Sequence, residues 1–173
     1  MKPFRIAILA EAPAYRIRPE KIRKFLGKIL RLLEWEKADL SVLLTHDKAI
    51  RRINRRYLGH DRPTDVISFS QIEGPSLKAA PGARPCLGDI VLSLETAERQ
   101  AAIYGNSPDY EIAFCLCHGI LHLMGHRDDT PSRGKDMERR QIRLLKRAGI
   151  AEDAVLGFAA RRKKVRTGRK RGS

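Results

Sequence analysis

The apolar residues fall into two kinds of run along the chain, and their order predicts an α+β fold. Four short runs alternate or are continuously apolar, as strands are; they are residues 4–9, 40–45, 66–69 and 87–94. Five longer runs repeat their apolar residues at helical spacing; they are residues 19–36, 48–58, 93–104, 108–125 and 132–148. This order predicts a single domain with a small mixed sheet of about four strands, covered by about five helices.

Two local features refine this prediction. A Gly- and Pro-rich segment, residues 73–85, predicts a surface loop between two strands that pair as neighbours. In the helix over 48–58, Ile50, Ile53 and Tyr57 are predicted to face inward, which leaves arginines on the outer face. These arginines are Arg51, Arg52, Arg55 and Arg56.

The end of the chain differs in character from the rest. Beyond Phe158 it is strongly basic and has nothing to bury against a core. A segment that buries no apolar surface does not offset the entropy of ordering it. We therefore expect a folded domain over residues 1–158 and a disordered basic tail over residues 159–173.

The helix that begins at Pro108 leads into the sequence HGILHLMGHRDD, which has the spacing of a metal site. His118 and His122 are four positions apart and lie about 40° apart on one helical face. Gly125 can adopt the left-handed conformation that ends a helix, so the chain can turn and bring Asp128 towards both imidazoles. The pattern matches the ligand layout of metzincin-type zinc sites, with Asp in the third place.

The third ligand has alternatives, because His126 and Asp129 lie close to Asp128 in the sequence. The glycine should end the helix before His126, so we choose Asp128. Cys115 lies one turn before His118 and could be a fourth ligand, although a small buried thiol is the simpler interpretation. Three protein ligands leave a position for water, as in catalytic sites, and we expect one Zn²⁺ per chain.

One residue of the metalloprotease pattern is absent. Those enzymes place Glu, their general base, directly after the first His, and this chain has Gly119 there. A peptidase hypothesis loses its main support, while the ligand spacing is retained.

The formal charge of +15 is present in both parts of the chain. Residues 161–171 carry +8, which leaves +7 for the remainder. A solubility tail would explain the end alone, whereas a basic folded body favours a polyanionic partner, most often nucleic acid. Candidate RNA-binding residues in the tail are Arg161, Arg162, Lys163 and Lys164.

The cellular context follows from what the chain contains. Three cysteines, two of them within a helical pattern, favour reduced thiols over a disulfide framework. No apolar run approaches the roughly 20 residues of a membrane span, and the N-terminal apolar run is too short for a convincing signal peptide. We expect a cytoplasmic protein without a membrane partner.

Three blocks of the sequence resemble the YbeY family of bacterial endoribonucleases, metal-dependent proteins of rRNA maturation and ribosome quality control. The blocks are Asn54 and Tyr57 followed by Asp61, Pro63 and TDVISF; LGDIVLS at residues 87–93; and HGILHLMGHRDD. The resemblance covers roughly residues 4–150. It implies a single-domain α+β fold, zinc held by three residues on the helix and the following turn, and single-stranded RNA as substrate, chiefly the 3′ end of 16S rRNA.

The chain departs from the family pattern at two positions. The family commonly has His where this chain has Asp128, and Asp is a competent zinc ligand. It also commonly has Arg directly after the tyrosine of the first block, where this chain has Leu58. Candidates to supply that charge are Arg56 in catalysis and Arg55 and Arg62 in RNA binding.

The resemblance implies a zinc-dependent, single-strand-specific endoribonuclease acting in 16S rRNA 3′-end maturation and ribosome quality control. Its partners would be rRNA and the small ribosomal subunit, and no nucleotide cofactor is expected. Asp65 and Asp89 are candidate proton acceptors, because the family's strands run beside the site; Asp89 could instead orient a ligand histidine. The alternative, motivated by Leu58, is a non-catalytic assembly factor that zinc stabilises and that binds rRNA.

Overall fold

The computed structural model describes residues 3–72 and 84–162. Most of the predicted loop over 73–85 lies outside the described residues, as do Lys163 and Lys164. The elements in chain order are β1 (Phe4–Ala10), β2 (Tyr15–Ile17), α1 (Pro19–Leu32), β3 (Ala38–Thr45), α2 (Asp47–Leu58), β4 (Val66–Ser70), β5 (Cys86–Ser93), α3 (Leu94–Tyr104), α4 (Pro108–Leu123), α5 (Pro131–Arg147) and β6 (Ala159–Arg161).

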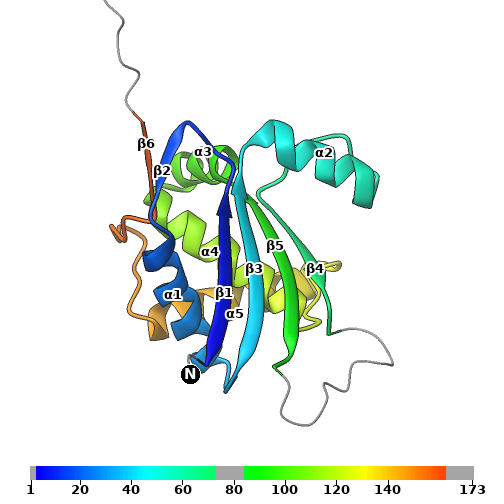
Figure 1. Ribbon diagram of the computed structural model, residues 1–173, viewed down its shortest axis with the longest axis vertical. Coiled ribbons are helices and arrows are strands. Elements are labelled where there is room, and N and C mark those ends of the chain that lie inside the picture. The colour runs from blue at the N-terminus through cyan, green and yellow to red at the C-terminus, as the bar shows by residue number, and fades with distance from the viewer. Residues whose placement is uncertain (1–2, 73–83, 163–173) are drawn as a thin grey trace, which may run out of the picture.

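The four longest strands form one mixed sheet in the order β1-β3-β5-β4 (Figure 1). β3 pairs in parallel with β1 and with β5, and β4 runs antiparallel to β5 with Val66 opposite Leu92. The predicted pairing of the strands over 66–69 and 87–94 is therefore confirmed. The α+β fold, with a four-stranded mixed sheet and five described helices, is confirmed as well.

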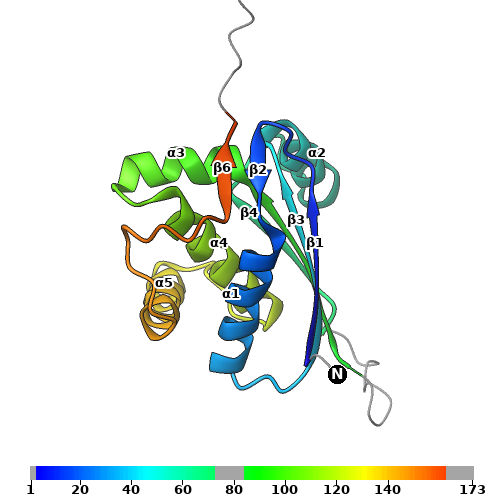
Figure 2. The same ribbon diagram turned by 60° about the vertical axis from the view of Figure 1, so that its left-hand side comes forward.

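The helices cover the two faces of the sheet unequally. Figure 2 shows α1, α4 and α5 on one side of the sheet and α2 on the other, near its upper end. The main core includes the fully buried Leu30, Leu92 and Leu116. A smaller cluster lies between α2 and the sheet and consists of Ile50 from α2, Ile67 from β4 and Val91 from β5. Within the described ranges, no helix combines the length and apolar character needed to cross a membrane.

The central helix α4 begins as its sequence predicts. The Ser107 hydroxyl accepts a hydrogen bond of 3.0 Å from the Tyr110 backbone N–H, and Pro108 occupies the first turn. A serine at this position satisfies one of the amide groups that the start of a helix leaves unpaired. Twelve of the sixteen residues of α4 are buried, so the helix is held in one position relative to the sheet.

Gly119 allows α4 to lie directly against the sheet. A Cβ atom there would be 3.0 Å from Cδ1 of Ile90 and 3.1 Å from Oγ of Ser68. The Ser68 hydroxyl donates to the Gly119 carbonyl at 3.1 Å, and the Ser70 hydroxyl donates to the Leu123 carbonyl at 2.9 Å. Gly119 occupies the position at which metalloproteases carry Glu, and the packing of α4 against the sheet leaves little room for a side chain there.

The chain beyond Phe158 corrects the predicted domain boundary. Ala159–Arg161 form strand β6, which pairs antiparallel with β2 so that Arg161 lies opposite Tyr15. The Arg161 guanidinium also lies 3.2 Å from a Glu98 carboxylate oxygen. The expected disorder is wrong for Ala159–Arg161, because backbone pairing and this ion pair order a segment that has little apolar surface of its own.

A second correction concerns Tyr57, which was predicted to face inward. Its side chain is 62% exposed at the end of α2, and its ring meets the ring of Phe69 edge-on, with centroids 5.5 Å apart. The helix covers only one end of this sheet face, so its last turn has no core beneath it.

Candidate metal centre

The turn after α4 has the geometry that its glycine predicts. Gly125 adopts the left-handed conformation with φ of 84°. Its N–H donates to the His122 carbonyl at 2.9 Å, and the His126 N–H donates to the Leu121 carbonyl at 3.0 Å. This is the Schellman arrangement that ends a helix. The chain turns back sharply at this point, which brings Asp128 beside the helix it has just left.

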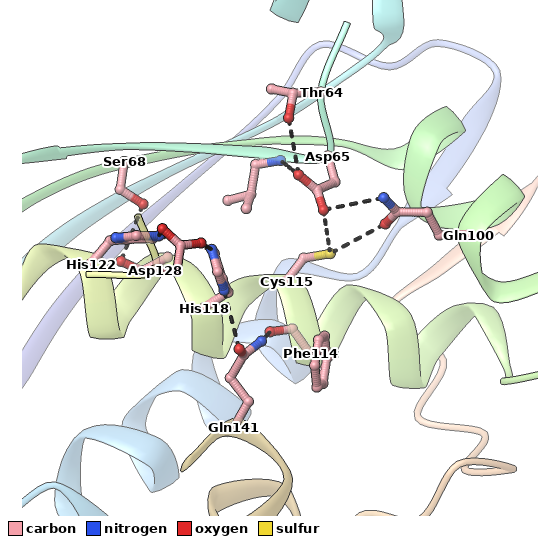
Figure 3. Close-up of polar contacts among 12 residues, drawn as sticks. Thr64, Asp65, Ser68, Gln100, Phe114, Cys115, His118, His122, Asp128 and Gln141 are labelled. Atoms are coloured by element: carbon pink, nitrogen blue, oxygen red, sulfur yellow. Dashed lines mark hydrogen bonds and ion pairs between the residues drawn. The ribbon is translucent and has the colours of Figure 1, made fainter. Parts of the chain in front are cut away.

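Two histidines and one aspartate converge at this turn (Figure 3). The Nε2 atoms of His118 and His122 lie 2.8 Å apart. Asp128 places one oxygen 3.3 Å from the first Nε2 and the other 3.5 Å from the second. Within the described part of the chain, these three residues are the group of His, Cys, Asp and Glu ligand atoms that could hold a metal ion.

The donor set can be tested against the size of a metal ion. Tetrahedral zinc with bonds of about 2.0–2.1 Å separates its ligand atoms by roughly 3.3 Å. The separations of 2.8, 3.3 and 3.5 Å lie on both sides of that value. Two imidazole nitrogens facing each other at this distance also require a proton or a cation between them. The residues therefore fit a zinc-sized cation.

Gln141 on α5 determines which nitrogen of His118 faces the group. The amide nitrogen of Gln141 donates to the Phe114 carbonyl at 3.1 Å, so its oxygen is left facing Nδ1 of His118, also at 3.1 Å. Nδ1 must then carry the proton, and Nε2 presents a lone pair to the metal position. Sequence reasoning missed Gln141. The sequence feature that could have pointed to Gln141 is its polar amide on the otherwise apolar face of α5, between Met137 and Leu144.

The other candidate ligands have different partners. Asp129 forms ion pairs with Arg127 at 2.9 Å and with Arg133 at 2.8 Å, and the hydrogen bond from Arg133 holds the pKa of Asp129 below its usual range. The thiol of Cys115 is buried, and burial raises its pKa well above the ordinary value, which disfavours the thiolate that binds metal. His126 lies outside the convergent group.

A cavity of about 410 Å³ opens on one side of His118 and His122, and its lining includes one cationic side chain, Arg127, which also pairs with Asp129 at 2.9 Å. His118, His122 and Arg127 line it together with Leu58, which is 51% exposed. Leu58 is the position where the family commonly has Arg, so the substitution falls beside the metal group. Arg55, Arg56 and Arg62 lie outside this lining.

Arg127 is the arginine that borders this cavity, and sequence reasoning missed it. Its position directly before Asp128, within the metal motif, was the available signal. Two arginines that the sequence did predict as functional lie in different surroundings. Arg56 lies over the ring of Tyr57 at 5.7 Å, and Arg161 is paired with Glu98.

The two candidate proton acceptors lie on opposite faces of the sheet. Asp65 borders a cavity of about 520 Å³ whose wall also includes His118 and Asp128. Its carboxylate accepts hydrogen bonds from the Val66 N–H at 2.7 Å and the Gln100 amide at 3.3 Å (Figure 3).

Asp89 faces away from α4. Its neighbours in β5 point towards that helix, because Cβ atoms at Gly88 and Gly119 would meet Leu123 and Ile90 respectively. Strand alternation turns Asp89 to the opposite face, where it accepts a hydrogen bond from Gln71. The structure does not bring Asp89 to the metal group, either as a proton acceptor or as a partner of a ligand histidine.

The fold is of the α+β class, and its His–His–Asp group could hold a metal ion. A family model described as Endoribonuclease YbeY matches residues 9–149. The chain belongs to the YbeY family.

Relatives that carry the family name agree with this assignment, and one solved structure shares the fold. An Endoribonuclease YbeY from Moorella thermoacetica is 47% identical over 65% of this chain and 74% of its own length. One from Geobacter metallireducens is 36% identical over 85% of this chain and 99% of its own. One from Myxococcus xanthus is 44% identical over 71% of this chain, which spans 41% of that protein. A solution structure of a Thermotoga maritima protein shares the fold, with a TM-score of 0.55 and 22% identity over 88% of this chain and 99% of that one.

Proposed function

We propose that this protein is a zinc-dependent endoribonuclease specific for single-stranded RNA, which acts in 16S rRNA 3′-end maturation and ribosome quality control. The observation that carries the proposal is the convergence of His118, His122 and Asp128 beside a cavity bordered by Arg127. The name of its relatives, Endoribonuclease YbeY, supports RNA as the substrate. The charge of +15 supports a polyanionic partner.

The metal would be held by Nε2 of His118, Nε2 of His122 and the Asp128 carboxylate. Held by these three residues, zinc would supply Lewis acidity. Gln141 keeps the proton of His118 on Nδ1, so that Nε2 stays available as a ligand. The guanidinium of Arg127 binds the phosphate to be cleaved and neutralises charge that develops on it.

Of the two candidate proton acceptors, the proposal retains Asp65. Its carboxylate borders the same cavity as His118 and Asp128, whereas Asp89 lies on the opposite sheet face. Three hydrogen bonds, from Thr64, Val66 and Gln100, hold the Asp65 carboxylate in place. A fixed carboxylate can receive the proton of an attacking group, either directly or through one water.

The basic surfaces would hold the rest of the RNA. Arg55, Arg56 and Arg62 are exposed near the Leu58 end of α2, and Arg161 and Arg162 are exposed at the end of the described chain. Together with Lys163 and Lys164 they would contact phosphates without reading the sequence, so affinity should fall steeply with salt. The proposed setting is the cytoplasm, with rRNA and the small ribosomal subunit as partners.

The test uses a precursor of small-subunit rRNA with an extended 3′ end. Wild-type protein should shorten it, and His122→Ala protein with an unchanged circular-dichroism spectrum should not. Gln71→Ala, an exposed substitution on the other face of the sheet, serves as the control and should cleave normally. Equal cleavage by wild-type and His122→Ala protein would rule the proposal out.

A second function is favoured by one observation, the Leu58 side chain beside the metal group where the family commonly has Arg. In that case the protein is a non-catalytic assembly factor, and the metal only stabilises the end of α4. The His122→Ala variant would then still bind rRNA and still complement a deletion strain. Neither the wild-type protein nor the variant would cleave the precursor.

A further inference from the structure

The 520 Å³ cavity on the second side of the metal group has a different character from the smaller one. It lies between α3, α4 and α5, and His118 and Asp128 form part of its wall. Its volume is in the range of pockets that bind small organic groups. His118 lines both cavities, Asp128 lines the larger one and His122 lines the smaller one. A substrate that extends to both sides of these three residues would therefore enter both cavities.

The linings of the two cavities differ in their charged residues. In the described part of the chain, the larger cavity is lined by five carboxylates and by neither lysine nor arginine. These carboxylates are Asp65, Glu111, Asp128, Glu138 and Glu152. Among the described residues that line the smaller cavity there is no carboxylate; Arg127 is its cationic residue, and the pairing of Arg127 with Asp129 takes place outside the lining. An RNA phosphate is repelled from the first and attracted to the second, so only an uncharged part of the nucleotide suits the larger cavity.

The walls of the larger cavity also carry groups that suit a planar heterocycle. Tyr104, at the end of α3, is 67% exposed, and Ile142 on α5 is 44% exposed. Exposed aromatic and aliphatic side chains at a cavity rim are surfaces on which unstacked bases can stack. Side-chain amides of Gln100 and Asn106 add hydrogen-bonding groups to the lining.

Glu111 shows which hydrogen-bonding partner the cavity lacks. This side chain borders the cavity although the residue is only 4% exposed, and Asn106 donates to its Oε2 at 3.2 Å. Burial, with a smaller effect from Asp65, raises the pKa of Glu111. A buried carboxylate with few donors is costly. A ligand that brings an N–H donor into the cavity would offset that cost.

We propose that this cavity binds the base of a nucleotide next to the cleaved phosphodiester, with a preference for bases that carry an exocyclic amino group over uracil. Carboxylates accept hydrogen bonds from such amino groups. Uracil presents a carbonyl oxygen where cytosine presents the amino group, and a carboxylate repels that oxygen. The inference rests on the proposed RNA-cleaving function and names a specificity pocket for it.

Binding is tested with uncharged nucleosides, because they cannot be held by phosphate contacts. Zinc-loaded, ¹⁵N-labelled full-length protein is titrated with cytidine and with uridine. We expect chemical-shift changes around Tyr104, Asn106 and Glu111, and at least severalfold tighter binding of cytidine. Glu111→Gln should reduce the difference between the two nucleosides, and Tyr104→Ala should weaken both. Ile103→Ala, an adjacent residue that is 75% exposed and lies outside the lining, should change neither.

Cleavage supplies the second readout. Two single-stranded oligonucleotides that differ only in C or U beside the cleaved bond should differ in kcat/KM for wild-type protein. Tyr104→Ala should lower kcat/KM by between about fivefold and about a hundredfold, the range that base–aromatic stacking supports. Ile103→Ala should retain the wild-type value.

The outcomes separate this inference from the proposed function. Selective binding of cytidine in the cavity without RNA cleavage supports a base-binding pocket and contradicts the proposed cleavage. Metal-dependent cleavage with equal or absent binding of the two nucleosides overturns the subsite and leaves the function standing. Shifts produced by MgCl₂ and not by cytidine also overturn it, because the cavity would then be a cation site.

Discussion

Gln141 and His118 are joined by a hydrogen bond of 3.1 Å that orients the imidazole with its Nε2 atom towards His122 and Asp128. Replacing Gln141 with Leu keeps a side chain of similar size and removes this bond. Partners of this kind typically contribute about 10–100-fold to metal affinity. We expect a loss of that size in Gln141→Leu protein, measured by competition with a chelator, and no loss in Gln71→Ala. Equal zinc affinities for wild-type and Gln141→Leu would contradict this role.

Arg127 borders the cavity beside His118 and His122, whereas the predicted Arg55, Arg56 and Arg62 lie outside its lining. We expect Arg127→Ala to lower kcat/KM for single-stranded RNA by roughly tenfold to a hundredfold, since a hydrogen bond to a charged group contributes roughly 1.5–3 kcal/mol. Arg52→Ala, an exposed arginine on α2 away from this cavity, is the matched control.

Leu58 allows a stricter test of the same idea. Because Leu58 and Arg127 border one cavity, adding Leu58→Arg to the Arg127→Ala protein should restore part of the lost activity. The idea fails if Arg127→Ala and Arg52→Ala behave alike and the double variant shows no recovery.

The absence of a side chain at Gly119 is a packing requirement. Gly119→Val should lower the free energy of unfolding by roughly 1–3 kcal/mol, because overpacking against Ile90 forces side chains or backbone to shift. Gly134→Ala in α5 is the control. A Cβ there would meet the Asp128 carbonyl only at 3.8 Å, so helix propensity predicts a gain of up to about 1 kcal/mol. Urea unfolding measures both, and a neutral Gly119→Val would refute the packing argument.

Tyr15 makes stability depend on pH at the alkaline end. Burial, and then the hydrogen bond to Glu98, raises the pKa of Tyr15 to about 12, whereas an unfolded tyrosine titrates near about 10. The folded protein holds the Tyr15 proton more tightly than the unfolded chain does. The resulting contribution to the free energy of unfolding is complete below about pH 10 and is lost as the pH rises towards 12. Between pH 9 and 12, wild-type protein should therefore lose more stability than Tyr15→Phe. Parallel curves would contradict this assignment.

Local patterns in the sequence predicted the metal-bearing helix well. The four-residue spacing of His118 and His122, and the turn at Gly125, depend on backbone geometry within two helical turns, which sequence records directly. The main strands and helices were predicted for the same reason, since their apolar periodicity is a local property.

Contacts between distant segments could not be predicted in this way. Gln141 lies 23 positions from His118, and β6 pairs with a strand more than 140 positions earlier. The direction of Asp89 depends on which sheet face α4 covers, and the exposure of Tyr57 depends on where α2 ends over the other face. Arg127 was visible in the motif, but its position at the cavity depends on how distant segments of the chain fold around it.

The most direct test of the account is the zinc content of purified protein together with cleavage of single-stranded RNA, across His118→Ala, His122→Ala, Asp128→Ala and Asp129→Ala. The matched pair is Asp128 and its neighbour Asp129, which pairs with arginines instead. We predict about one zinc per chain and metal-dependent cleavage in wild-type protein, with zinc retained in Asp129→Ala and lost in the other three. Full zinc content in Asp128→Ala, or undiminished cleavage by metal-stripped protein, would contradict the account.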